Sequence, residues 1–78
     1  MLYIVPTPIG NLQDMTYRAV EILNTVALIL AEDTRQSARL TQHYDIHTPM
    51  RSFHQHNEHK SLEGILSQLR DGISMALI

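Results

Sequence analysis

The sequence predicts an α/β fold, βαβαβαβ in order, whose strands form a parallel sheet. Short uncharged runs recur along the chain, a polar turn follows each run, and segments with the apolar spacing of helices lie between them. Strands that alternate with helices in this way are typical of right-handed βαβ units. Hydrophobic residues make up 44% of the chain and charged residues 18%, so a packed globular fold is expected.

The first strand is expected at residues 2–5 and the first helix at about residues 16–24. Residues 2–5 carry no charge, which suits a strand buried on both faces, and prolines follow directly. Asp14 or Thr16 is expected to cap the helix, because a short polar side chain can accept from its free amides. The apolar face of this helix consists of Ala19, Val20, Leu23 and Val26.

A second uncharged run, residues 26–31, predicts a buried strand that ends at a polar turn, residues 32–35. The helix expected next, at about residues 34–43, has a thin apolar stripe and should lie at the surface. Its apolar positions are Ala38, Leu40 and Tyr44.

A third strand is expected at residues 49–53, near a sheet edge, because a proline without an amide donor begins it. Asn57 is available to cap the last helix and Gly72 to end it. The apolar face of that helix consists of Leu62, Ile65, Leu66 and Leu69, at positions i, i+3, i+4 and i+7.

Residues 74–78 predict a fourth strand, inside which the sequence stops. We therefore expect residues 1–78 to be the N-terminal portion of one domain, with a second domain absent. An apolar terminal strand exposes an unpaired edge, so association through it is expected, with a homodimer as the simplest form.

Composition excludes several classes of protein. The 78 residues suffice for one small core and contain no cysteine, which rules out a disulfide framework and a thiolate zinc site. The longest apolar run, residues 25–31, is far shorter than the roughly 20 residues that span a bilayer, so no membrane association is expected and the cytoplasm is the default location. A net charge of -2 gives no overall attraction to a polyanion.

Ligand sites in open parallel sheets lie beyond the carboxyl ends of the strands, so three loops are candidates: residues 6–14, 32–35 and 54–58. In the first loop two prolines fix the backbone and Gly10 permits close approach, which gives a rigid, amide-bearing surface for a flat or anionic ligand. A merely stiff connection is equally compatible with these residues. The Gly-Lys-Ser/Thr ending of a phosphate P-loop is absent.

The second loop places two carboxylates and a guanidinium at the end of a central strand. Neighbouring side chains of a strand point to opposite faces, so at most one of Glu32 and Asp33 can face the cleft directly. The alternative is that Asp33 or Thr34 only caps the next helix and that Arg35 is solvated.

The third loop contains the only local cluster of metal-capable side chains, with His54, His56 and His59. Their spacing matches no standard zinc arrangement, so no metal is assigned, and solvated or capping histidines are the simpler interpretation. A metal-binding domain stays open as an alternative, as does a module that binds a nucleotide or metabolite without chemistry.

Three stretches, residues 2–12, 31–35 and 52–58, together resemble the ribosomal RNA small-subunit methyltransferase I family of the tetrapyrrole methylase superfamily. The resemblance covers essentially the whole chain. It implies S-adenosyl-L-methionine-dependent methylation of the 2′-hydroxyl of a cytidine in 16S ribosomal RNA, with the small-subunit RNA or the 30S subunit as partner. It also implies a Ser-Asp-Ala-Gly-Thr-Pro segment after the fourth strand and a second domain that closes the cleft, so residues 1–78 alone should be inactive.

In the wider superfamily the first loop carries a Gly-x-Gly-Pro-Gly pattern near the cofactor, of which only the last glycine is kept here, as Gly10. This departure favours the RNA-methylating branch, although a small tetrapyrrole acceptor stays open. The resemblance assigns the cofactor to Thr7, Pro8, Ile9 and Gly10. For catalysis we expect a carboxylate to assist removal of the hydroxyl proton and neighbouring groups to orient ribose and phosphate. The candidate residues for these roles are Glu32, Asp33, Arg35, His54 and Asn57.

Overall fold

The computed structural model of the chain describes residues 1–6, 14–53 and 58–78, with side chains described throughout these ranges except at residues 58–61. Its elements are β1 (Leu2–Ile4), α1 (Tyr17–Thr25), β2 (Leu28–Ala31), α2 (Thr34–His43), β3 (Met50–Ser52), α3 (Glu58–Arg70) and β4 (Met75–Leu77). The strands form one parallel sheet in the order β1-β4-β2-β3. The predicted α/β fold with alternating strands and helices is confirmed.

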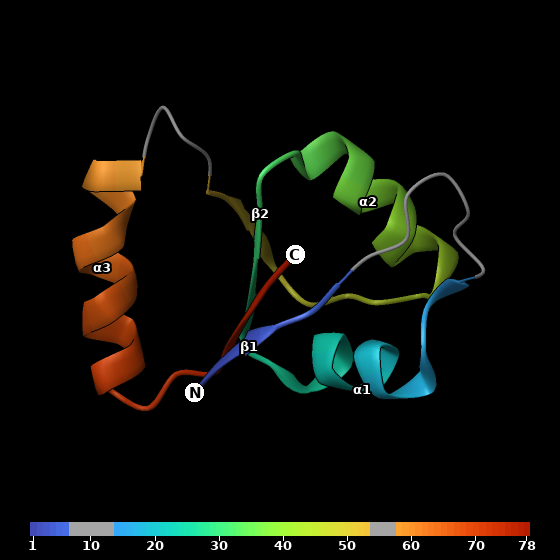
Figure 1. Cartoon of the computed structure of the whole chain (residues 1–78), viewed down its shortest axis with the longest axis horizontal. Coiled ribbons are helices and arrows are strands. Elements are labelled where there is room, and N and C mark those ends of the chain that lie inside the picture. The colour runs from blue at the N-terminus through green and yellow to red at the C-terminus, as the bar shows by residue number, and fades with distance from the viewer. Residues whose placement is uncertain (7–13, 54–57) are drawn as a thin grey trace.

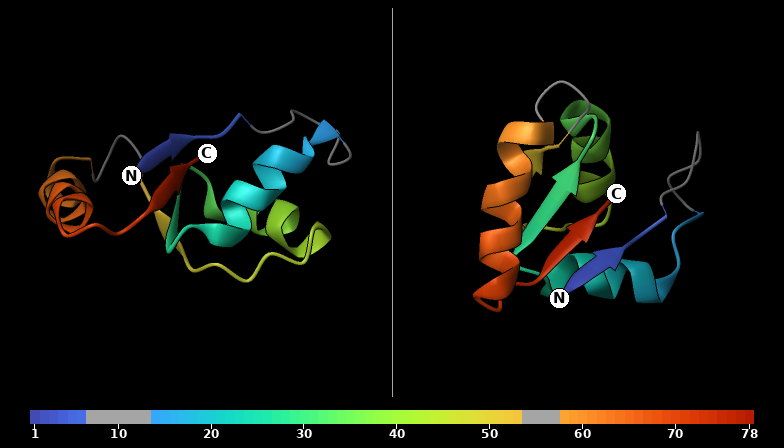
Figure 2. Two further views of the ribbon diagram at one scale, coloured as in Figure 1. Left: turned by 90° about the horizontal axis from the view of Figure 1, so that it is seen from below. Right: turned by 60° about the vertical axis from the view of Figure 1, so that its left-hand side comes forward.

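The elements form three layers, with α1 and α2 on one face of the sheet and α3 on the other (Figures 1 and 2). Neighbouring residues of a strand point to opposite faces, and the two apolar clusters follow this rule. Ile29 and Ala76 belong to the cluster on the α1 side, whereas Leu30 and Met75 pack with Ile65 of α3. The uncharged strands β2 and β4 are therefore covered on both faces.

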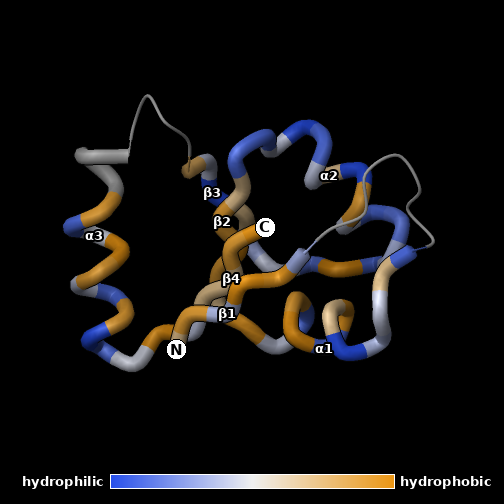
Figure 3. Tube along the Cα trace, in the orientation of Figure 1, coloured by the Kyte–Doolittle hydropathy of each residue, from blue (hydrophilic) through white to orange (hydrophobic). Residues whose placement is uncertain are grey.

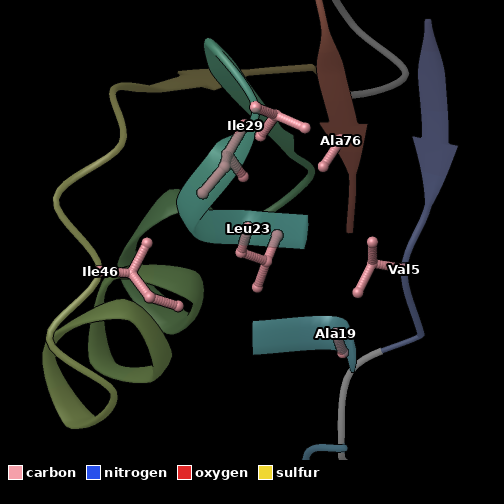
Figure 4. Packing of buried hydrophobic residues seen from close by; sticks show 7 residues of the cluster. Val5, Ala19, Leu23, Ile29, Ile46 and Ala76 are labelled. Atoms are coloured by element: carbon pink, nitrogen blue, oxygen red, sulfur yellow. The ribbon is translucent and has the colours of Figure 1, made fainter. Parts of the chain in front are cut away.

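Helix α1 begins where the sequence predicts. The Thr16 hydroxyl caps it by accepting a hydrogen bond from the Ala19 amide at 3.0 Å. Ala19 and Leu23 are buried against the sheet, and Leu23 lies at the centre of this packing (Figure 4). The helix ends at Val26, whose amide still donates to the carbonyl of Ile22, so β2 begins later than predicted.

Helix α3 buries only part of its predicted apolar face. Ile65 is buried and Leu69 is half-buried, but Leu62 and Leu66 remain 43% and 40% exposed. Gly72 ends the helical segment with φ +88, a conformation that glycine adopts without strain. Helix α3 thus has an outer apolar edge that no described residue covers completely.

The expectation that β1 is buried on both faces is wrong. Tyr3 and Val5 pack on the α1 side, but Leu2 and Ile4, which alternate with them, are 44% and 68% exposed. The reason is positional: β1 is an edge strand, and the buried cluster beneath α3 consists of residues from β2, β4 and α3. The α3 side of β1 therefore presents an apolar surface.

The expectation that the fourth strand has an unpaired edge is also wrong. The chain returns through α3 to place β4 between β1 and β2, so the backbone of β4 is hydrogen-bonded on both sides. The edge strands of the described sheet are β1 and β3, and for β3 an edge position was predicted. Association through the edge of β4 is thereby excluded, and a homodimer stays a prediction without a surface assigned to it.

Within the described ranges, no helix is both long and apolar enough to cross a membrane.

Candidate functional site at the carboxyl ends of the strands

The carboxyl ends of all four strands lie at one edge of the sheet, because the strands are parallel. Backbone hydrogen bonds join these ends across the sheet at 2.8 to 3.0 Å. The amide and carbonyl partners are Val5 with Leu77, Ile78 with Leu30, and Phe53 with Ala31. The three candidate loops therefore start from adjoining positions on one edge.

The segments that follow β2 and β3 cross to opposite faces of the sheet. After β2 the chain enters α2 on one face of the sheet, whereas after β3 it enters α3 on the other face (Figure 2). Adjacent strands whose connections leave to opposite faces form a topological switch point, where open α/β sheets bind ligands in the crevice between the two loops. The turn at residues 32–35 follows β2 at this point of the sheet.

A largely polar cavity of about 430 Å³ opens at this turn. The residues that line it are Glu32, Asp33, Gln36, Ser37 and Ile78. It combines two carboxylates, an amide and a hydroxyl with one apolar side chain at the end of β4. Such a lining suits a ligand that carries both polar groups and a hydrophobic part.

Asp33 is the N-cap of α2. Its Oδ1 accepts hydrogen bonds from the amides of Arg35 at 3.0 Å and Gln36 at 3.3 Å. This geometry confirms the capping alternative for Asp33 and shows that one of its oxygens is already occupied by the helix amides.

Replacing Asp33 with alanine is expected to lower the free energy of unfolding by about 1 kcal/mol, because two amides of α2 lose their acceptor. Urea denaturation followed by circular dichroism measures this loss. The matched control is Asp33→Ser, which keeps a capping oxygen and should retain most of the stability. Equal losses in the two variants would contradict a capping role.

Glu32 is exposed and directly follows the buried Ala31. No hydrogen bond or ion pair joins its carboxylate to a residue in the described ranges, in contrast to Asp33. Of the two carboxylates that line the cavity, Glu32 is the one that accepts no hydrogen bond from a described residue.

Arg35 is exposed in the first turn of α2 and does not line the cavity. The cavity lining includes Gln36, Ser37 and Ile78, none of which the sequence singled out. Residues 33, 36 and 37 follow the i, i+3, i+4 spacing of a helix face, so the lining could have been found by extending the predicted helix back to its cap.

The other predicted site residues, Thr7, Pro8, Ile9, Gly10, His54 and Asn57, lie outside the described residues, as does His56. Within the described ranges there is no group of three side chains that could hold a metal ion.

A second cavity of about 570 Å³ lies between α1 and α2, away from the strand ends. Its lining is mainly apolar and aromatic: Met15, Tyr17, Val20, Glu21, His43 and Tyr44. The rings of His43 and Tyr44 meet edge to face at a centroid distance of 4.9 Å. No pattern in the sequence indicates this cavity beyond the aromatic character of residues 17 and 44.

The fold and the site define a three-layer α/β protein with its candidate site at the carboxyl ends of β2 and β4, two neighbouring strands of a parallel sheet. A family model described as Tetrapyrrole (Corrin/Porphyrin) Methylases matches residues 1–78. The chain belongs to this family.

Three curated relatives that resemble the chain share one name. The chain is 54% identical over 78 residues to a protein of Synechocystis sp., 50% identical over 78 residues to one of Bacillus subtilis, and 51% identical over 77 residues to one of Escherichia coli O157:H7. Each is named ribosomal RNA small subunit methyltransferase I. These matches cover 99 to 100% of this chain but 27 to 28% of the relatives, so the chain spans little more than a quarter of their length.

The described lining is compatible with the methyl donor that the family implies. S-adenosylmethionine carries a sulfonium cation, charged amino-acid groups and a flat nucleoside. The polar side chains of the cavity suit its charged groups, and the Ile78 side chain suits apolar contact with it.

Proposed function

We propose that this chain forms one wall of the active site of an S-adenosylmethionine-dependent methyltransferase that modifies small-subunit ribosomal RNA. The observation that carries the proposal is the polar cavity at the carboxyl ends of β2 and β4, in a chain 50 to 54% identical to proteins named ribosomal RNA small subunit methyltransferase I. The resemblance specifies the 2′-hydroxyl of a cytidine in 16S ribosomal RNA as acceptor. Because ribosomal subunits are cytoplasmic, the protein would act in the cytoplasm.

In this proposal the bound cofactor supplies an electrophilic methyl group. A ribose hydroxyl holds its proton too firmly to react at neutral pH, so a base must accept that proton as the methyl group is transferred. Glu32 is the proposed base, because it lines the cavity and makes no hydrogen bond to a described residue. Arg35 would hold a neighbouring phosphate.

Residues outside the described ranges complete the proposed site. Thr7, Pro8, Ile9 and Gly10 follow β1 and would contact the cofactor, while His54 and Asn57 follow β3 and would orient the ribose. Both assignments rest on the resemblance. They also rest on the topology, because β1 and β3 end at the same edge of the sheet as β2, which precedes Glu32.

The proposed activity also requires polypeptide of the kind that makes up the rest of the relatives, because one wall cannot enclose a cofactor and an RNA. The exposed Leu2 and Ile4 support this view, since an apolar surface on an edge strand suits a packed neighbour. We therefore propose that residues 1–78 act as the N-terminal part of a larger enzyme and are inactive alone.

The direct test is a chimaera in which these 78 residues replace the matching part of the Synechocystis relative, which is 54% identical over this length. Transfer of radioactive methyl groups from S-adenosylmethionine is measured with two acceptors, unmodified small ribosomal subunits and a porphyrinogen. Incorporation into the subunits is expected, at a rate within about tenfold of the intact relative, which serves as the control. Failure of a folded chimaera to label subunits would contradict the proposal.

A small tetrapyrrole acceptor is the second candidate, favoured by the family description and by the net charge of -2. Incorporation into the porphyrinogen alone would establish it in place of the RNA.

A further inference from the structure

The outward face of α2 is a cationic and polar stripe without acidic residues. At 3.6 residues per turn, positions 35, 39 and 43 lie one above the other, and positions 36 and 42 flank them. All five are exposed, and they are Arg35, Gln36, Arg39, Gln42 and His43. The stripe extends for about 12 Å between the first and last of its three aligned positions. Figure 3 shows α2 as predominantly hydrophilic.

The two arginines of this stripe have no carboxylate partner within the described ranges. The ion pairs found there are Arg18 with Glu21 and His47 with Asp45, both outside α2. The chain as a whole has 8 acidic and 6 basic residues, so a helix with two arginines and no acid departs from the average of the surface. Unpaired guanidinium groups in a row are typical of phosphate recognition.

Arg35 places a positive charge where the start of a helix usually has a negative one. It lies in the first turn of α2, where the helix dipole favours negative charge, and the only carboxylate described at this helix end is that of the cap, Asp33. Local choices that oppose stability are common at functional sites. A requirement for an anionic ligand explains a cation at this end of the helix.

The stripe is continuous with the candidate site. Gln36 both flanks the aligned positions 35, 39 and 43 and lines the cavity that contains Glu32. A strand of nucleic acid whose acceptor nucleotide enters this cavity would continue along α2, and its phosphates would meet Arg39 after Arg35.

We propose that the outward face of α2 binds the phosphodiester backbone of the RNA flanking the acceptor nucleotide, with Arg39 as its central contact. The proposal rests on the RNA-methylating function proposed above and extends it to an RNA-docking surface outside the cavity. The net charge of -2 is compatible with it, because the surface depends on the local distribution of charge.

The test compares the chimaera described above with its Arg39→Gln variant in binding a short fluorescein-labelled single-stranded RNA, by fluorescence anisotropy at several KCl concentrations. Glutamine keeps the helix propensity of arginine and removes the charge. We expect affinity to fall about tenfold and the slope of log K against log[KCl] to become shallower by about 0.7. Arg39→Lys should keep most of the salt dependence.

Arg70→Gln is the matched control, because Arg70 is an exposed arginine near the end of α3, on the opposite face of the sheet. It should bind RNA like the unmodified chimaera. Equal losses in the two glutamine variants, or no loss in Arg39→Gln, would overturn the proposal, as would an unmodified chimaera that does not bind the RNA. Methyl transfer by the chimaera is measured separately. If the chimaera labels subunits but its RNA affinity does not depend on Arg39, the proposed function stands and only the α2 surface is rejected.

Discussion

Leu23→Ala is expected to lower the free energy of unfolding by about 3 kcal/mol, because the side chain is fully buried. Leu23 is 0% exposed and lies between α1 and the sheet, where Val5, Ile29 and Ala76 surround it (Figure 4). Its removal leaves a cavity that three different elements border, so no single shift can close it. A chain of 78 residues has a total stability of about 4 to 12 kcal/mol, so the loss is a large fraction of the whole.

Urea denaturation followed by circular dichroism measures this effect, and Leu66→Ala is the matched control. Leu66 undergoes the same chemical change on α3 but is already 40% exposed, and alanine favours the helix, so its loss should stay below about 1 kcal/mol. Comparable losses at the two positions would contradict the packing of α1 described here.

The sequence predicted the elements well because local signals agreed with the fold. Thr16 and Asp33 are short polar residues directly before apolar-periodic segments, and each caps the helix that follows. Gly72 stands where α3 must end. Continuous uncharged runs predicted buried strands at residues 26–31 and 74–78, and the sheet places β2 and β4 at its centre.

The errors concern the order of the strands, which no local signal contains. Leu2 and Ile4 are as apolar as the residues of β2, yet they are exposed because β1 lies at an edge. β4 was expected to have an open edge because it comes last in the sequence, whereas α3 carries it between β1 and β2. Strand order depends on which face each crossover helix covers, a property of the whole sheet.

The candidate site was predicted only in part, because some of its residues come together through the order of the strands. The polar turn after β2 is a local feature, so Glu32 and Asp33 were identified from the sequence alone. Ile78 enters the cavity only because β4 lies beside β2, which the sequence does not state. The division of roles between the two carboxylates also required the structure, because the sequence left open whether Asp33 or Thr34 caps α2.

Glu32→Gln in the chimaera is expected to reduce the rate of methyl transfer to small ribosomal subunits by about 10² to 10⁴, the range that general-base catalysis contributes. Glutamine has the shape of glutamate but accepts no proton at neutral pH, and Glu32 has no described structural partner that the change would disturb. Folding and cofactor affinity should therefore stay close to those of the unmodified chimaera. Single-turnover methylation and calorimetry with S-adenosylmethionine measure the two quantities separately.

Asp33→Asn is the matched control for this prediction, because it removes the neighbouring negative charge from the same cavity while asparagine still caps α2. A base at Glu32 requires that this variant retain most of the rate. A general loss of negative charge from the cavity would instead slow both variants alike, and a base at Asp33 would reverse their order. Unchanged rates in both variants would show that neither carboxylate takes part in methyl transfer. The division between one capping carboxylate and one free carboxylate is thus tested by two isosteric changes at adjacent positions.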